Sequence, residues 1–187
     1  LDDRFTLSIL SGVSQMLPED IMRGEETLIA GYLLTKKNFD GSICIPGTHS
    51  KWINVKKAKI LNFSTFLTGE LFDLLSYQSI LKFSITDNKF SKDKFIEGIN
   101  EVFHNPQKFT NQLFQLRAKH LLKNQKSIHT NSLLSGYIVG IELLGSKDYW
   151  YKKDLILIGS KFMNSCYKLA LNNKVNSIKI LDSTNIL

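Results

Sequence analysis

The sequence predicts an α/β protein with a mixed sheet and flanking helices, and three observations lead to this class. Short apolar segments with strand character follow one another at 42–47, 51–55 and 58–67. Helical periodicity dominates the middle of the chain. An apolar strand, an amphipathic helix and a second strand then come in series over 154–182, an order that favours a parallel pair joined by a right-handed crossover.

The N-terminal part carries weaker signals. Residues 5–10 alternate weakly and end near Gly12, which indicates a short strand and a turn. The polar, Pro-containing stretch 17–26 is expected to be irregular. From Glu25 onward, good helix formers predict a helix whose first turn carries acidic residues, where the helix dipole favours them. A turn follows at 38–41.

The three central strand segments should form a small antiparallel unit. Residues Gly47–Lys51 lie at one of its turns, and Lys56 and Lys57 lie near the other. Thr68 is placed to cap a helix over 69–81. The inward face of that helix should consist of Leu71, Leu74, Leu75 and Gln78.

Three further helices are expected before the C-terminal βαβ unit, and the second opens with Asn105 as a cap and Pro106 at the first helical position. These helices span 91–103, 105–122 and 129–145. The βαβ unit consists of a strand over 154–159, a helix over 160–171 and a strand over 175–182. Since no repeat or linker interrupts the chain, one α/β domain over 1–187 is the simplest organisation.

Composition narrows the class of protein. With 187 residues, 43% of them hydrophobic and 22% charged, the chain can bury one core. Its most apolar stretch, 133–145, is shorter than the roughly 20 residues of a membrane span and carries Glu142. The first residues are acidic where a secretory signal needs positive charge. We therefore expect a cytoplasmic protein without membrane contact, with Cys44 and Cys166 as reduced core residues.

The net charge of +7 suits small anionic substrates. The lysines stand in short scattered groups and form no basic stripe with interleaved aromatic residues. A nucleic-acid partner is therefore not expected.

The turn Gly47–Lys51 can bring backbone N–H groups, the hydroxyls of Thr48 and Ser50 and one cation to a single point, which is what a phosphate group requires. The pattern is not that of the P-loop, and strand turns also carry Gly, Thr and Ser for conformational reasons. The pattern alone leaves both interpretations open.

The segment "MRGEET" at 22–27 places Arg23 beside Glu25 and Glu26 at the start of a helix. These carboxylates could orient an acidic substrate, activate a hydroxyl or hold Mg²⁺ through water. The alternative is structural, because acidic residues at a helix N-terminus commonly stabilise the helix.

These segments together resemble one family. The specific motifs are "MRGEET" at 22–27, "PGTHSKW" at 46–52 and "TGEL" at 68–71. Their order resembles that of the 2-dehydro-3-deoxygalactonokinase family, and their separations are compatible with it. "LRAKHLL" at 116–122 and "LLSGYIVGIEL" at 133–143 extend the resemblance over nearly the whole chain. The family consists of sugar-acid kinases, so the resemblance implies a ribonuclease-H-like, actin-like ATPase domain of the hexokinase type.

The resemblance also implies a reaction. ATP would phosphorylate the primary hydroxyl of 2-dehydro-3-deoxy-D-galactonate to the 6-phosphate, with Mg²⁺ as cofactor, in galactonate breakdown. The implied partners are the small sugar acid and ATP, with no nucleic acid and no membrane, and a homodimer is left open. No residue of the chain is assigned as a metal ligand.

Site residues follow from the matched motifs. Gly47, Thr48, Ser50 and Lys51 resemble the family's second phosphate-binding turn and would face the phosphates of ATP. In related sugar kinases a carboxylate shortly before that turn deprotonates the attacking hydroxyl, so Glu25 or Glu26 is the candidate base. Arg23 would hold the substrate carboxylate or stabilise the transferred charge.

Other assignments are less specific. Thr68, Gly69 and Glu70 would line the cleft, unless Thr68 only caps its helix. Gly159 and Ser160 resemble the strand–Gly–helix turn against which adenine lies in actin-like kinases, and a plain strand–helix turn is the alternative. Glycines at 136 and 140 are expected to serve close helix packing rather than a ligand.

Full-length members of the family begin with a strand and a first phosphate turn that do not occur in this chain. The chain is therefore expected to be the C-terminal, nucleotide-side part of a sugar-acid kinase that lacks the N-terminal first-phosphate domain. The alternative is a non-catalytic nucleotide-binding or remnant domain of the same fold.

Overall fold

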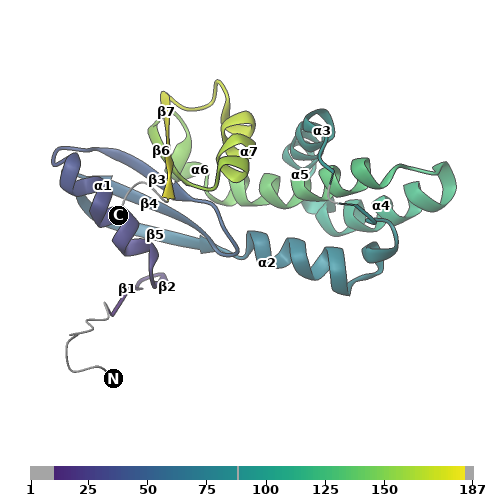
Figure 1. The fold of residues 1–187 in the computed structure, drawn as a ribbon, viewed down its shortest axis with the longest axis horizontal. Coiled ribbons are helices and arrows are strands. Elements are labelled where there is room, and N and C mark those ends of the chain that lie inside the picture. Colours follow the sequence, from purple (N-terminus) through teal and green to yellow (C-terminus); the bar gives the residue numbers. More distant parts are fainter. Residues whose placement is uncertain (1–10, 88, 184–187) are drawn as a thin grey trace, which may run out of the picture.

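A five-stranded mixed sheet forms one end of the molecule (Figure 1). The computed structural model describes residues 11–87 and 89–183, so the strand expected over 5–10 lies outside the described residues. The five strands are β3 (Gly41–Ile45), β4 (Ser50–Lys56), β5 (Lys59–Phe66), β6 (Asp154–Gly159) and β7 (Ser177–Asp182). Their order is β5-β4-β3-β6-β7, with β3, β4 and β5 antiparallel and β3, β6 and β7 parallel. The predicted antiparallel unit and the predicted parallel pair are both confirmed.

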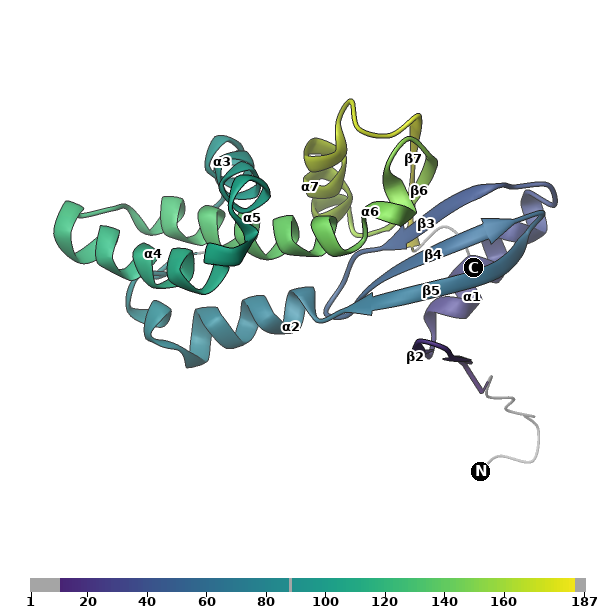
Figure 2. The same ribbon diagram turned by 180° about the vertical axis from the view of Figure 1, so that it is seen from behind.

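The helices lie around and beside the sheet. Their bounds are α1 (Glu25–Thr35), α2 (Thr68–Asp73), α3 (Lys92–His104), α4 (Phe109–Lys123), α5 (Ser127–Gly145), α6 (Lys147–Trp150) and α7 (Lys161–Leu171). In Figures 1 and 2 helices α2 to α4 and the first part of α5 form the end of the molecule opposite the sheet. Helix α5 runs from that end to the sheet. Among the described residues no helix combines the length and apolarity needed to cross a membrane.

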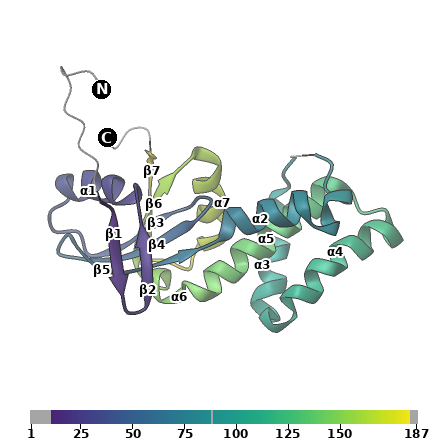
Figure 3. The ribbon, with the colours of Figure 1, turned by 90° about the horizontal axis from the view of Figure 1, so that it is seen from below.

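The stretch 17–26, expected to be irregular, contains a strand. It belongs to a hairpin of β1 (Val13–Met16) and β2 (Glu19–Met22), which lies on the β5 side of the sheet (Figure 3). The Asp20 carboxylate accepts hydrogen bonds from the backbone N–H and the hydroxyl of Thr65 at 2.7 and 2.6 Å. The Gln15 amide pairs with both backbone groups of Phe63. The side chains of Gln15 and Asp20 thus anchor the hairpin to β5 and order a strand whose own sequence does not alternate between polar and apolar residues.

Each face of the sheet is covered by different helices. Along β3, Ile43 and Ile45 point to the side covered by α1, whereas Cys44 points to the side covered by α5, α6 and α7. The result is a sheet between two helical layers, which accounts for the buried strand sequences. Burial raises the pKa of the Cys166 thiol to about 11 and also raises the pKa of Cys44, so both are inert core residues as predicted.

Two helix predictions need correction. Thr68 is the first residue of α2 and does not cap it, since the N-cap position is Leu67. The inward face was also partly wrong, because α2 continues into a π-helical turn over Leu74–Gln78 that rotates the following side chains. Leu71 and Leu75 do pack inward, whereas Leu74 and Gln78 are exposed.

The connection before α4 also differs from the prediction. Pro106 begins a short 3₁₀ turn, Pro106–Lys108, rather than the α-helix itself, and the Asn105 side chain makes no capping hydrogen bond. Helix α3 lies where it was predicted, within one residue at each end, and its side chains Phe95, Ile99 and Val102 are buried.

Helices α3 and α5 approach each other closely where glycines face one another. A Cβ atom on Gly136 would lie 2.2 Å from the carbonyl oxygen of Phe95 and 3.0 Å from Cα of Gly98. On Gly140 it would meet Ile99 and Val102 at 3.3 and 3.4 Å. The packing interpretation of these two glycines is therefore confirmed.

We predict that Gly136→Ala lowers the free energy of unfolding by about 1–3 kcal/mol, because the added methyl group overpacks the contact between the helices. The higher helix propensity of alanine offsets part of this loss. Gly47→Ala is the matched control, since no atom lies within 4 Å of its added Cβ and its backbone needs no left-handed conformation. Urea unfolding of both variants measures the difference, and equal stabilities would contradict the close approach.

Candidate functional site

Several chain segments meet at one edge of the sheet. Strands β3 and β6 are parallel. Strand β5 runs in the same direction as β3, because β3 and β5 are each antiparallel to β4. Their carboxyl ends therefore lie at the same edge. The β3–β4 turn, the start of α2 and the start of α7 all follow these ends, so the topology gathers them at one place. Most candidate site residues of the sequence occur in or next to these segments, whereas Arg23, Glu25 and Glu26 lie at the start of α1.

The β3–β4 turn is packed against the start of α2. The backbone N–H of Glu70 donates to the carbonyl oxygen of Thr48 at 3.1 Å. A Cβ atom on Gly69 would lie 2.7 Å from both the Gly47 oxygen and Thr48 Cα, so only glycine fits there. At the surface, His49 Nε2 and Glu70 Oε2 are 2.5 Å apart. The structure thus brings the residues of the "TGEL" motif to the candidate phosphate turn.

On the α1 side of the turn, the two candidate bases are used differently. Glu25 Oε1 lies 3.6 Å from Lys51 Nζ, and its other oxygen accepts the Arg23 backbone N–H at 3.0 Å. Glu26 accepts the Gly24 backbone N–H at 2.6 Å and lines a separate apolar hollow between α1 and the start of β5. Glu25 therefore lies at the turn, and Glu26 lies away from it.

Lys51 and Ser50 are more enclosed than a surface turn would suggest. Lys51 is only 5% exposed, and the one carboxylate that the described residues place in ion-pair distance of it is that of Glu25. Ser50 is fully buried, and its Oγ lies 3.1 Å from the hydroxyl of Tyr167. The Ser50 oxygen also accepts the Gly47 backbone N–H at 3.4 Å. Thr48 and Gly47 line the adjacent pocket instead.

A buried carboxylate lies behind the turn. Glu142 of α5 is 1% exposed and accepts hydrogen bonds from the Trp52 indole at 2.6 Å and the Tyr167 hydroxyl at 2.6 Å. The Thr68 hydroxyl also donates to it. Burial raises the pKa of Glu142, and the hydrogen bonds from Thr68, Tyr167 and Trp52 act in the opposite direction. The net shift is upward.

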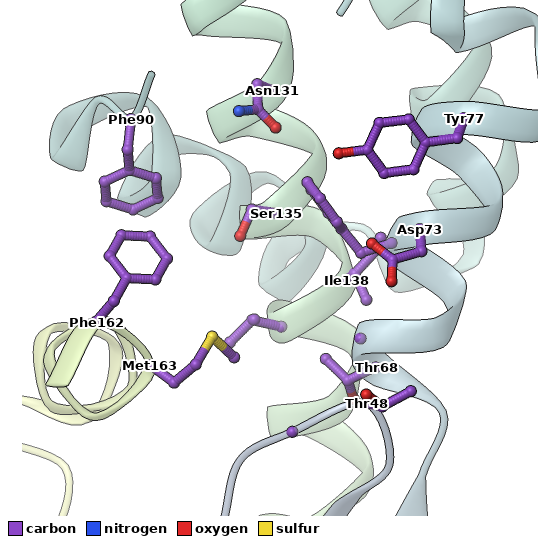
Figure 4. Close-up of a pocket in the computed structure, with 14 residues that line it drawn as sticks. Thr48, Thr68, Asp73, Tyr77, Phe90, Asn131, Ser135, Ile138, Phe162 and Met163 are labelled. Atoms are coloured by element: carbon purple, nitrogen blue, oxygen red, sulfur yellow. The ribbon is translucent and has the colours of Figure 1, made fainter. Parts of the chain in front are cut away.

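A pocket of about 420 Å³ opens on the other side of the turn (Figure 4). Gly47, Thr48 and Thr68 form one end of it. Phe90 and Phe162 stand at one wall with ring centroids 5.2 Å apart, and Asp73 and Tyr77 come from the opposite wall. Mostly apolar walls with a few polar groups are typical of small-molecule sites.

Asn131 gives this pocket a defined polar group. Its Nδ2 atom donates to the backbone oxygens of Asp87 at 3.4 Å and Lys89 at 3.2 Å. Because these bonds use the amide nitrogen, they orient the Asn131 carbonyl oxygen as an acceptor on the pocket side.

The predicted nucleotide contacts Gly159 and Ser160 lie at the β6–α7 turn, beside this pocket but not in its lining. The Ser160 side chain caps α7 by accepting the Met163 backbone N–H at 3.4 Å. A Cβ atom on Gly159 would lie 3.2 Å from Asn164 Oδ1 and 3.4 Å from Pro46. Close packing of the two turns explains both residues, and their contact with a nucleotide stays a prediction.

Sequence reasoning missed most of the pocket. Asn131 lies on a helix that the sequence assigned to packing, and Phe90 lies outside every predicted element. Phe162 follows the predicted nucleotide turn at Gly159 and Ser160 but was not itself proposed as a contact. Glu142 did give a signal, because an ionisable residue in an otherwise apolar helix needs buried partners or a function. Its partners come from three other elements, so the pattern could not name them.

The geometry can now be compared with known proteins. The model of the 2-keto-3-deoxy-galactonokinase family matches residues 3–187. The chain belongs to this family. A 2-dehydro-3-deoxygalactonokinase of Rhizobium meliloti is 32% identical over 183 residues, which are 95% of this chain and 60% of that protein. The Escherichia coli 2-dehydro-3-deoxygalactonokinase is 34% identical over 131 residues, covering 70% of this chain and 44% of that protein.

A solved kinase structure supports the same assignment. A crystal structure from Sinorhizobium meliloti, assigned as a 2-dehydro-3-deoxygalactonokinase, matches with a TM-score of 0.86 and 31% identity over 94% of this chain and 60% of that one. The predicted actin-like ATPase fold, with its mixed sheet and flanking helices, is confirmed. The chain spans about three fifths of the length of the Rhizobium relative.

Among the residues that the structure describes, no three side chains of His, Cys, Asp or Glu gather in a way that could hold a metal ion. Mg²⁺ that arrives with a nucleotide keeps several waters and needs only one or two protein carboxylates. Glu25, beside the turn, is a donor of that kind, so the residues present fit a nucleotide-borne Mg²⁺.

We predict that Glu142→Gln changes how stability depends on pH. The raised pKa means that the unfolded state releases the Glu142 proton first as the pH rises. The stability contributed by protonated Glu142 is complete below its unfolded pKa, about 4.3, and is lost as the pH rises through the folded pKa. The glutamine variant lacks this loss. Its free energy of unfolding should therefore rise relative to that of the unsubstituted chain from about pH 4.5 upward, and the difference should then become constant.

Urea unfolding of both proteins between about pH 4.5 and 8 measures this difference. The difference in the free energy of unfolding at any one pH also contains the effect of the lost hydrogen bonds. The test is therefore how this difference changes with pH. Parallel stability curves, or a gain for the unsubstituted chain with rising pH, would contradict the upward shift.

Proposed function

We propose that the chain is the C-terminal, nucleotide-side part of a sugar-acid kinase that transfers the γ-phosphoryl group of ATP to the primary hydroxyl of 2-dehydro-3-deoxy-D-galactonate, giving the 6-phosphate. The observation that carries the proposal is the β3–β4 turn, which has a carboxylate and a lysine on one side and an apolar pocket on the other. The names of the relatives support the substrate.

In this proposal the turn binds the phosphates of ATP. The backbone N–H groups of the turn, the Thr48 hydroxyl and the Lys51 ammonium supply the donors, and Gly47 allows close approach. Ser50 contributes through its position in the turn, because its hydroxyl is buried against Tyr167. Bound Mg²⁺ would arrive with the nucleotide, keep several of its waters and neutralise part of the phosphate charge, which leaves Glu25 free to act on the acceptor hydroxyl.

Glu25 is the proposed general base rather than Glu26. It lies at the turn, whereas Glu26 is bonded to Gly24 and lines the separate hollow between α1 and β5. Glu25 accepts the proton of the sugar hydroxyl, whose oxygen bonds to the γ-phosphorus as the bond to the β–γ bridging oxygen breaks and ADP leaves. Arg23, exposed at the same helix start, holds the substrate carboxylate.

The pocket is the proposed site of the nucleoside. Phe90 and Phe162 offer aromatic surface to a base, and the Asn131 carbonyl oxygen can accept a hydrogen bond from an exocyclic amine such as that of adenine. Thr68 and Gly69 lie between the pocket and the turn, in line with the cleft role predicted for them. The sugar acid and ATP are thus the proposed ligands, and the homodimer and the cytoplasmic location stay predictions.

The deciding assay measures ADP release from Mg·ATP by the 187-residue chain, with and without 2-dehydro-3-deoxy-D-galactonate. Release that depends on the sugar acid supports the kinase. Nucleotide binding without release would favour the non-catalytic nucleotide-binding domain, and absence of both from a folded sample would overturn the proposal.

We predict that Glu25→Gln lowers kcat for sugar-acid phosphorylation by about 10²–10⁴-fold, because the attacking hydroxyl loses its base. The matched control is Glu26→Gln, which removes the neighbouring charge but leaves the turn untouched, and it should keep nearly full turnover. Steady-state ADP release measures both. Equal losses in the two variants would refute the assignment of the base to Glu25.

We predict that Phe162→Ala weakens binding of Mg·ADP about five- to hundredfold, the usual value of one lost stacking contact with a base, and leaves tripolyphosphate binding unchanged. Phe114→Ala is the control, since Phe114 is similarly exposed, 62% against 55%, but lies on α4 outside the pocket. Calorimetric titration gives the dissociation constants. A parallel loss of tripolyphosphate binding would contradict a contact with the base.

A further inference from the structure

We propose that Glu142 is a positioning residue for the phosphate turn, which it holds from two sides through hydrogen bonds that its carboxylate forces into one direction. The inference rests on the proposed function, because the turn matters only if it binds phosphate. Glu142 itself lies too deep to touch a ligand, being 1% exposed and outside the pocket lining.

The first connection runs through α7. The Tyr167 hydroxyl donates to a Glu142 carboxyl oxygen at 2.6 Å. The Tyr167 oxygen is then left to accept the Ser50 hydroxyl, 3.1 Å away. Ser50 Oγ in turn accepts the Gly47 backbone N–H at 3.4 Å. Every donor in this chain points toward Glu142, and its far end is the first residue of the turn.

The second connection runs through α2. The Thr68 hydroxyl donates to Glu142, which holds the first residue of that helix against α5. The next residues of α2 contact the turn directly, by the bond from the Glu70 N–H to the Thr48 oxygen and by the close approach of Gly69. A third donor, the Trp52 indole, ties the carboxylate to β4 at 2.6 Å.

The two acceptor oxygens of Glu142 suit this place better than an amide or an apolar side chain would. Burying a charge is costly unless donors surround it, and here donors converge on it from β4, α2 and α7. A glutamine amide would offer only one acceptor oxygen and would turn N–H groups toward donors. An apolar residue would leave the hydroxyls of Thr68 and Tyr167 free to reorient. The polarity of the whole network therefore depends on Glu142.

The test separates positioning from stability. Tyr167→Phe cuts the first connection, and Thr68→Val cuts the second. Tyr137→Phe is the matched control, because the buried Tyr137 hydroxyl also donates to a carboxylate, that of Glu101, in the helical part of the molecule. The three variants should lose similar stability, since each loses a hydrogen bond to a carboxylate.

Calorimetric titrations with Mg·ADP, tripolyphosphate and adenosine then give the readout. We expect Tyr167→Phe and Thr68→Val each to weaken tripolyphosphate and Mg·ADP binding about tenfold. Tyr167 lies outside the pocket lining, so Tyr167→Phe should leave adenosine binding unchanged. Tyr137→Phe should leave all of these affinities unchanged. If one of the two network variants does not fold, the other still tests the proposal. Ser50→Ala can stand in for Tyr167→Phe, because it cuts the first connection at its turn end.

The outcomes distinguish the two proposals. Tripolyphosphate binding that is unchanged in every folded network variant, with normal binding by the unsubstituted chain, would overturn the positioning role and leave the proposed function standing. Equal losses for Tyr137→Phe and Tyr167→Phe would also overturn it, since general destabilisation would then explain both. Failure of the unsubstituted chain to bind tripolyphosphate and Mg·ADP would overturn the proposed function and the inference with it.

Discussion

The parallel pairing of β3 with β6 is the constraint on which the rest of the structure depends. It joins strands that are more than one hundred residues apart in the chain, with Cys44 opposite Leu157. Because β4 returns antiparallel to β3, and β7 follows β6 through the α7 crossover, one pairing sets the direction of every strand. The turn after β3 and the helix after β6 then necessarily lie side by side.

This arrangement brings backbone segments into close contact, and glycine residues make such contacts possible. Gly159 accommodates Pro46 where the β3 and β6 turns meet, and Gly69 accommodates Gly47 and Thr48 where α2 meets the same turn. A methyl group at either position would have to displace a neighbour, most severely the backbone at 2.7 Å from Gly69. The glycines that the sequence suggested as ligand contacts thus first serve to bring the segments of the site together.

The sequence predicted the regular elements well where hydrophobic periodicity is strong. The helices α3 and α7 were found because each buries one distinct face, as Phe95 and Ile99 do in α3. The strands β3 to β7 were found from short apolar runs, and α1 and α5 from longer runs of apolar and helix-forming residues. Strand β2 was missed because its sequence "EDIM" does not alternate between polar and apolar residues and is ordered by Asp20 bonding to another strand. Long-range side-chain anchors of this kind leave no local pattern.

The site shows the same division. The motif around Gly47–Lys51 was visible as a local cluster of phosphate-binding residue types, but the choice between Glu25 and Glu26 required the fold. Neighbouring residues on a helix point about 100° apart, so only one of the two could face the turn. The donors to Glu142 come from β4, α2 and α7, and no spacing in one segment predicts such a convergence.

The two sides of the β3–β4 turn differ in chemistry, and this difference gives the proposed reaction a direction. On the pocket side the surface is aromatic and mostly apolar, which suits a nucleoside. On the α1 side Lys51 and Glu25 offer a cation and a base, which suit a phosphoryl group and an acceptor hydroxyl. A nucleotide that lies across the turn would therefore present its terminal phosphate toward Glu25. The sugar acid must then approach from the start of α1, where Arg23 is exposed to receive its carboxylate.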